Sequence, residues 1–410
     1  MIYFQLLFVL FYGLLTDLNL PKSTRFITDI ITIVLFILVI TSKEKTGLTQ
    51  YKMIIGSMIL WYIFMVIFAL FKSPDFMQII WASRNWIRFF LFLIACLTFL
   101  DNEDIKRIIK CLNYIYVFNF ILLGIQFATG LRDDHLGGIF GSEVGANGST
   151  NIFICGILIL HLAESVVKKR FSNFAIFTLV SSMTIAALAE IKVFYYEFIF
   201  IVFAVLILSL FKSKGIRKVH IQIGISAICA FAIGMIMIIN IYPDRVSVLT
   251  GNASIERYEE ATEWTYQISR TKAIPQINEL FFGDDIQLKL TGYGFGNCEY
   301  SNIAAFRSGF YDEFGNLNYI WFSHQLLYLE GGLIGLGLYI LIYISFLAYS
   351  FRRFLRKSSD NHQYIFGIVF SAIVLINVFY NNDLRSDIAY LIFFFLAAGV
   401  FDYSKNKQEK

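Results

Sequence analysis

Hydrophobic residues along the chain form long uninterrupted blocks instead of alternating with polar residues. A helix needs about twenty apolar residues to cross a hydrocarbon core of roughly 30 Å. Inside a membrane only helices and closed barrels satisfy the backbone hydrogen bonds, and unbroken apolar blocks favour helices. The pattern therefore predicts an all-α polytopic membrane protein with about twelve transmembrane helices. The blocks lie at about 2–19, 26–41, 53–71, 86–100, 112–130, 149–167, 171–190, 193–211, 219–242, 332–351, 364–381 and 387–403.

One connection between the blocks is much longer than the others. Residues 243–318 form a mostly polar segment that is too long for a passive connector. Apolar residues at three- and four-residue steps within it predict an amphipathic helix, with Asn252 or Ser254 as its cap. These apolar residues are Ile255, Tyr258, Ala261, Trp264 and Ile268.

A second helix is predicted where this segment returns to the membrane, at NYIWFSHQLLYLE. The apolar stretch 319–351 is too long for one span, and Gly331 and Gly332 divide it. We interpret its first part as an interfacial helix that turns into the membrane. The chain thus divides into a transmembrane bundle at 1–242, a large segment between spans nine and ten at 243–331, and further spans with a tail at 332–410.

The overall composition agrees with a membrane protein. The chain of 410 residues is 57% hydrophobic and 18% aromatic, its mean hydropathy is +0.65, and 16% of its residues are charged. Soluble domains carry about 25% charged residues. The first twenty residues lack a basic start and a small-residue cleavage site, so we expect a retained span and not a signal peptide. Four of the five cysteines lie in or at the ends of apolar blocks, which indicates no disulfide framework or metal site.

The distribution of Lys and Arg predicts how the spans are oriented. One set of alternate connections holds 20 of the 34 basic residues, and the other set holds 8, among them Arg25, Arg84, Arg88 and Arg385. Because cytoplasmic loops carry the excess of Lys and Arg, both termini are predicted to be cytoplasmic. The long segment is then external.

Arg84 and Arg88, in WASRNWIRFF, are exceptions to this rule. They are four residues apart, so they share one face of a helix, at the predicted outer end of the fourth span. Two guanidinium groups on one face can bind a phosphate or pyrophosphate in fork geometry. The alternative is that each arginine extends to anionic lipid headgroups.

Two further polar groups lie at predicted outer ends. A glycine-rich loop before the sixth span contains Asn147 and Asn151, whose side-chain amides could bind sugar hydroxyls. The alternative is that these residues only form ordinary turns, which explain many glycine- and asparagine-rich loops. Between the seventh and eighth spans, AEIKVFYYE holds Glu190, Lys192 and Glu197 near the membrane boundary. A local ion pair is the alternative interpretation there.

Arg270 and His324 flank the second half of the long external segment. Arg270 follows the predicted amphipathic helix, and His324 lies on the predicted interfacial helix. An unperturbed histidine pKa of ~6.5 suits proton transfer, whereas a lone histidine is more often structural. We interpret His161, which lies within a span near the cytoplasmic side, as structural.

Three glycines alternate with other residues in TGYGFGNC: Gly292, Gly294 and Gly296. Glycines let backbone amides close around an anion, but no P-loop lysine follows them and no nucleotide is expected outside the cell. We predict that this loop mainly sets a tight path for the backbone, with an accessory role for its amides at a lipid pyrophosphate as the alternative.

Four stretches of the chain, taken in order, resemble the bacterial O-antigen polymerase and O-antigen ligase family. They are SRNWIR, GGIFGSEVGAN, the pair ISRTKAI and TGYGFGN, and SHQLLYLEGGLIGLGLY. The resemblance implies a GT-C-like architecture and glycosyl transfer at the outer face of the bacterial cytoplasmic membrane, from a polyprenyl-pyrophosphate sugar donor to a sugar hydroxyl. It implies no cofactor, metal or nucleic acid. Membrane lipid, chain-length regulators and flippases are the implied partners. Members often carry a Ser-Arg-Gly type of sequence where this chain has EIKVFYYE.

This resemblance gives each candidate residue an expected role. Arg270, Arg84 and Arg88 would bind the donor pyrophosphate together with Lys192, since cations stabilise the charge of a leaving group. His324 would remove the proton from the attacking hydroxyl. Asn147, Gly292, Gly294 and Gly296 would bind glycan or shape the loops. Two alternatives stay open: transfer of finished glycan to a terminal acceptor by a ligase, and a lipid-linked oligosaccharide flippase or other transporter.

Overall fold

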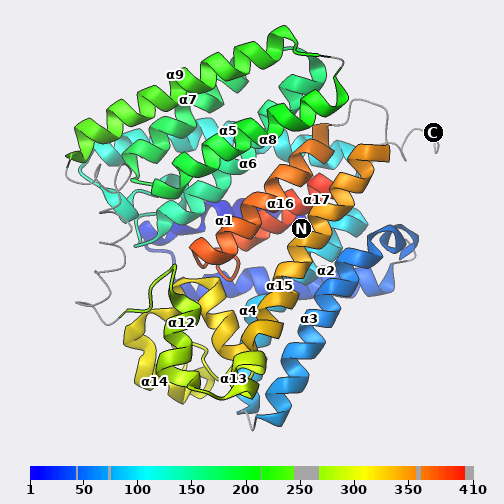
Figure 1. Cartoon of the computed structure of the whole chain (residues 1–410), viewed down its shortest axis with the longest axis vertical. Coiled ribbons are helices and arrows are strands. Elements are labelled where there is room, and N and C mark those ends of the chain that lie inside the picture. The colour runs from blue at the N-terminus through cyan, green and yellow to red at the C-terminus, as the bar shows by residue number, and fades with distance from the viewer. Residues whose placement is uncertain (43–44, 73–74, 214, 244–266, 357–361, 402–410) are drawn as a thin grey trace.

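A computed structural model describes the chain over residues 1–42, 45–72, 75–213, 215–243, 267–356 and 362–401 (Figure 1). Helices are the only regular secondary structure in these ranges, which confirms the predicted all-α class. Each of the twelve predicted apolar blocks contains a helix. These helices are α1 (Ile2–Asp17), α2 (Phe26–Thr41), α3 (Lys52–Phe71), α4 (Phe76–Phe99), α5 (Asn102–Ala128), α6 (Ala146–Lys168), α7 (Asn173–Leu188), α8 (Lys192–Lys212), α9 (Lys218–Ile241), α15 (Ser323–Arg356), α16 (His362–Tyr380) and α17 (Ala389–Val400).

Nine helices in the described part of the chain are long and apolar enough to cross a membrane. They are α4, α5, α6, α8, α9, α15 and α16, together with α2 and α3 when the 3-10 turns before them are included, as Lys22–Thr41 and Leu48–Phe71. The helices α1 and α7 have 16 residues each and α17 has 12. They are therefore shorter than the roughly twenty residues that a perpendicular span requires.

Polar caps set the starts of several helices. Asp101 and Asp104 form a reciprocal capping box at the start of α5. Asp75 accepts a hydrogen bond from the Met77 amide at the start of α4, and Ser172 caps α7 in the same way. Such side chains satisfy amides that the first helical turn leaves unpaired, which explains why these helices begin directly after short polar links.

The helix α16 lies near the centre of the bundle, where it packs against α15, α17, α6 and α8. Figure 1 shows the helices α5 to α9 grouped on one side of it and α2, α3, α4 and α15 on the other. The backbones of α16 and α17 approach closely at Gly367 and Gly399. A Cβ atom on Gly367 would lie 2.6 Å from the Gly399 carbonyl oxygen. Small residues permit such close packing between membrane helices.

The predicted break at the double glycine is present in α15. Gly332 has φ 59° and ψ −161°, so α15 consists of two helical parts that meet at this residue. A Cβ atom there would lie 2.3 Å from the Leu290 backbone, so both the conformation and the space require glycine. The first part begins at Ser323, later than predicted, because residues 319–321 form a short 3-10 turn.

The described half of the long segment folds onto the first part of α15. Its short helices are α12 (Ala273–Ile277), α13 (Ile286–Thr291) and α14 (Gly309–Phe314), and α13 packs directly on α15. Apart from Ile268, whose amide donates to the Leu317 carbonyl, the residues that predict the amphipathic helix lie outside the described ranges.

Candidate functional site

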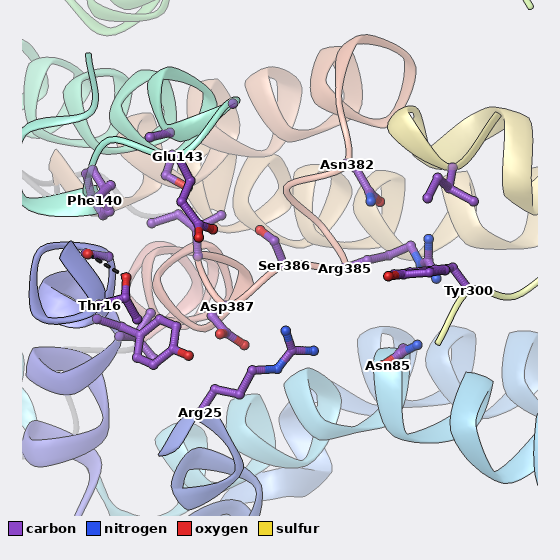
Figure 2. A pocket seen from close by; sticks show the side chains of 18 of the residues that line it. Thr16, Arg25, Asn85, Phe140, Glu143, Tyr300, Asn382, Arg385, Ser386 and Asp387 are labelled. Atoms are coloured by element: carbon purple, nitrogen blue, oxygen red, sulfur yellow. Dashed lines mark hydrogen bonds between the residues drawn. The ribbon is translucent and has the colours of Figure 1, made fainter. Parts of the chain in front are cut away.

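A cavity of about 420 Å³ opens between α1, α4, the start of α6 and the link between α16 and α17 (Figure 2). Each of these segments lines the cavity with the end that the distribution of Lys and Arg predicts to be external. The lining mixes aromatic rings, side-chain amides, hydroxyl groups and charged groups, as small-molecule sites do. The polar lining includes Tyr12, Arg25, Asn85, Arg88, Glu143, Tyr300, Asn302, Asn382, Arg385, Ser386 and Asp387.

Arg84 and Arg88 are held by carboxylates at this cavity. Two nitrogens of Arg84 donate to Asp29 Oδ2, at 2.9 and 2.6 Å. Arg88 Nη1 lies 3.2 Å from Asp29 Oδ1 and 3.0 Å from Asp387 Oδ1, and Arg88 Nη2 donates to the Arg385 carbonyl. Binding of pyrophosphate by this arginine pair would require that these buried ion pairs break, which opposes the role expected from the sequence.

Arg385 forms the most buried ion pair of the cavity wall. Its guanidinium lies 2.5 Å from Glu299 Oε2, and the Glu299 side chain is fully buried. Asn85 of α4 donates to the same carboxylate oxygen at 3.3 Å. This pair was not assigned a role from the sequence, although Arg385 belongs to the basic residues that stand at predicted outer ends.

Arg25 differs from the other arginines at the cavity. Figure 2 shows its side chain extending from just before α2 toward Asp387 and Asn85. No carboxylate lies within ion-pair distance of Arg25 in the described ranges, and its Nε is buried without a hydrogen-bond partner. Sequence reasoning counted Arg25 as an outer basic residue but did not single it out.

Arg270 and His324 lie next to each other on the far side of the α16–α17 link. The Arg270 guanidinium stacks on Phe322 at 4.5 Å and on Tyr380 at 4.4 Å. The His324 ring lies close to the backbone of Arg270 and is 5.3 Å from the Phe379 ring. The structure therefore brings the two residues together, as the sequence predicted, but neither lines the cavity described above.

His324 is buried and its ring makes no well-formed hydrogen bond. Its side chain is 2% exposed, and the backbone of Arg270 and that of Val378 lie close to the ring, although neither ring nitrogen meets a partner in good hydrogen-bond geometry. A buried polar group without a partner costs roughly 1–3 kcal/mol, and such groups in native proteins call for an explanation.

Asn147 and Lys192 are linked to this pair through the α16–α17 connection. Ser323 donates to the Asn381 carbonyl, and Asn381 Nδ2 lies 2.5 Å from Asp383 Oδ2. Asp383 faces the start of α6, where a Cβ atom on Gly148 would lie 3.3 Å from Asp383 Oδ1. The neighbouring Asn147 donates to Asp134 Oδ1 at 2.8 Å and to the Ala189 carbonyl at 3.3 Å.

Lys192 begins α8, three residues after Ala189. Its Nζ lies 2.9 Å from Glu190 Oε1, as the local ion pair considered for this stretch requires. Six candidate residues from the sequence thus divide into two groups. Arg88 lines the cavity and Arg84 adjoins it through the shared Asp29, whereas Asn147, Lys192, Arg270 and His324 do not line it.

Asp383 is a buried carboxyl group that sequence reasoning missed. Burial raises its pKa to about 7, the Glu197 carboxylate adds to the rise, and the hydrogen bond from Asn381 opposes it. The pKa in the fold is higher than the ordinary value of 3.8. The fold therefore favours the protonated acid, and stability is lost as the pH rises from about 4 to about 7.

We expect Asp383→Asn to remove this loss of stability. The apparent melting temperature of the wild type in detergent should fall between about pH 5 and about pH 8, and that of the variant should fall less. Thermal unfolding followed by tryptophan fluorescence at both pH values measures the difference. Equal pH dependence of the two proteins would contradict the assignment to Asp383.

The amides of the glycine loop donate to an acidic side chain of the protein itself. Gly296 N and Cys298 N donate to Glu330 Oε1 at 3.0 and 3.1 Å. The φ angles of Gly292, Gly294 and Gly296 are +66°, +101° and +94°, a region that favours glycine. The loop thus fixes the first part of α15, which carries His324, against the external segment.

The described ranges contain no cluster of three or more His, Cys, Asp or Glu residues that could hold a metal ion. No protein-family model matches the chain, and no curated protein matches it.

Proposed function

We propose that this protein is a membrane glycosyltransferase that polymerises lipid-linked oligosaccharide repeat units of an O-antigen, capsule or exopolysaccharide. The observation that carries the proposal is the buried His324 imidazole, which makes no well-formed hydrogen bond and is packed beside Arg270. The proposal includes twelve spans in a GT-C-like arrangement in the bacterial cytoplasmic membrane, with both termini in the cytoplasm. The Arg270–His324 pair then faces the outside of the cell.

His324 acts as the general base in this scheme. A hydroxyl oxygen of the acceptor sugar attacks the anomeric carbon of the donor while His324 takes the hydroxyl proton. The bond from the anomeric carbon to the pyrophosphate oxygen breaks, and the polyprenyl pyrophosphate leaves with the electron pair. The rings of Phe322 and Phe379 flank His324, so they move aside when the acceptor enters.

Arg270 stabilises the departing pyrophosphate. Its guanidinium lies against two aromatic rings, in a half-buried position where charge stabilisation is stronger than in water. No nucleotide is available outside the cell, so the donor must bring its own activated leaving group. Arg84 and Arg88 are less suited to this task because Asp29 and Asp387 already neutralise them. Lys192, which is paired with Glu190, is a weaker candidate for the same reason.

Purified protein in lipid nanodiscs tests the proposed reaction. We expect it to convert polyprenyl-pyrophosphate-linked repeat units into a ladder of longer lipid-linked chains, without any transmembrane gradient and without an added acceptor. Gel electrophoresis of the labelled products measures the ladder. Transfer that occurs only when a terminal acceptor is added would indicate a ligase instead, and movement of intact units across a bilayer without new bonds would indicate a transporter.

A further inference from the structure

We propose that the cavity beside Arg25 binds an acidic saccharide, a sugar that carries a carboxylate or a phosphate group. The sugar rests against the aromatic and amide lining, and its anionic group binds the Arg25 guanidinium. The choice of a saccharide rests on the proposed function, whereas the choice of an anionic one rests on the charges of the cavity wall.

The charges of the cavity wall leave one cation in excess. Arg84 and Arg88 share Asp29 and Asp387, Arg385 pairs with Glu299, and Lys22 pairs with Glu143. These contacts join four cations to four carboxylates, and Arg25 is a fifth cation. The excess positive charge therefore falls on Arg25, which has no carboxylate within ion-pair distance in the described part of the chain.

Several polar atoms of the lining also lack partners. The Nε atoms of Arg25, Arg88 and Arg385 and the Oδ1 atom of Asn382 are buried without hydrogen bonds. Four such atoms around one space are unusual because buried polar groups are normally satisfied. A ligand with several hydroxyl groups can donate to Asn382 and accept from the guanidinium groups at the same time.

Aromatic rings at the wall favour a sugar over a small inorganic ion. Trp81 stacks on Phe306 with ring centroids 5.2 Å apart and an interplanar angle of 11°. Its Nε1 donates to the Tyr300 carbonyl at 2.9 Å, which fixes the indole at the cavity. Tyr12 also lines the cavity. The volume of about 420 Å³ lies in the range of small-molecule sites, about 300–1,000 Å³.

Titration of purified protein with simple sugars tests this site without any polymerisation. The probes are methyl β-glucuronide, glucose 6-phosphate, methyl β-glucoside and inorganic phosphate, with binding followed by ligand-observed NMR. We expect at least one acidic sugar to bind about 10-fold or more tightly than the neutral glucoside, because hydrogen bonds to charged groups contribute most. The acidic sugar that binds more tightly identifies the anionic group.

Arg25→Gln should reduce the ratio of acidic-sugar affinity to glucoside affinity to about one, with little change in the binding of the glucoside. Arg132→Gln is the matched control because Arg132 is exposed at the same end of the bundle and does not line the cavity. It should keep the wild-type ratio. Equal binding of acidic and neutral sugars, or of inorganic phosphate and glucose 6-phosphate, would overturn the inference.

A glycan ladder formed by protein that lacks the preference for acidic sugars would leave the proposed function standing. Binding of acidic sugars by protein that forms no ladder would overturn the proposed function alone.

Discussion

Purified His324→Ala protein is expected to form polymer at least about 100-fold more slowly than the wild type, because general acid–base catalysis contributes roughly 10²–10⁴-fold. The His324 ring is buried beside Arg270 and makes no well-formed hydrogen bond in the described structure, so its loss should affect the reaction more than the fold. The rate of ladder formation from lipid-linked repeat units measures the effect. Arg270→Ala is expected to share this defect, since the leaving group then lacks its cation.

A second histidine provides a control for this experiment. His161 is 7% exposed and lies within α6, where its Nε2 is 2.9 Å from Asn113 Oδ1. His161→Ala also removes a buried imidazole, but it should keep polymer formation near the wild-type rate once protein amounts are matched. Normal polymer from a His324→Ala protein that accumulates and melts like the wild type would remove His324 from the reaction.

Much of the fold follows from local properties of the sequence. The apolar blocks predicted every long helix because the length and hydropathy of a span are read residue by residue. The break in α15 was predictable for the same reason, since two successive glycines interrupt one apolar stretch that is too long to cross the membrane once. The late start of α15 at Ser323 was missed because a 3-10 turn and a helical turn have nearly the same apolar pattern.

The partners of the candidate cations were not predictable in this way. Arg84 and Arg88 stood out as basic residues at a predicted outer helix end, and the structure places them on α4. Their neutralisation by Asp29 depends on the packing of α2 against α4, which joins positions 55 and 59 residues apart. The sequence alone gave no reason to choose Asp29 over other acidic residues as the partner of these two arginines.

The glycine loop shows a similar limit. Its composition indicated amides arranged around an anion, and Gly296 and Cys298 are arranged in this way. The acceptor is the Glu330 carboxyl group, 34 positions from Gly296, and a lipid pyrophosphate has no part in these two contacts. Local sequence specified the shape of the loop, and tertiary packing decided what occupies it.

Loss of the buried Glu299–Arg385 ion pair is expected to have the largest effect on stability. The Glu299 side chain is fully buried and the Arg385 side chain is 8% exposed. The pair joins the external segment to the α16–α17 link, and Asn85 connects both to α4. Glu299→Ala leaves the Arg385 charge buried without this partner, which typically costs about 3–5 kcal/mol. The apparent melting temperature in detergent should fall by several degrees.

A control and a double variant show whether the lost pair causes this effect. Asp312→Ala breaks the more exposed Arg307–Asp312 pair in the same external segment, and exposed pairs contribute little, so its melting temperature should stay near that of the wild type. The double variant Glu299→Ala with Arg385→Ala removes both charges. It should be less destabilised than the sum of the two single variants, because each single change leaves an unpaired buried group and the double change does not. Additive losses would mean that the two side chains contribute independently and that the ion pair does not hold the link to the external segment.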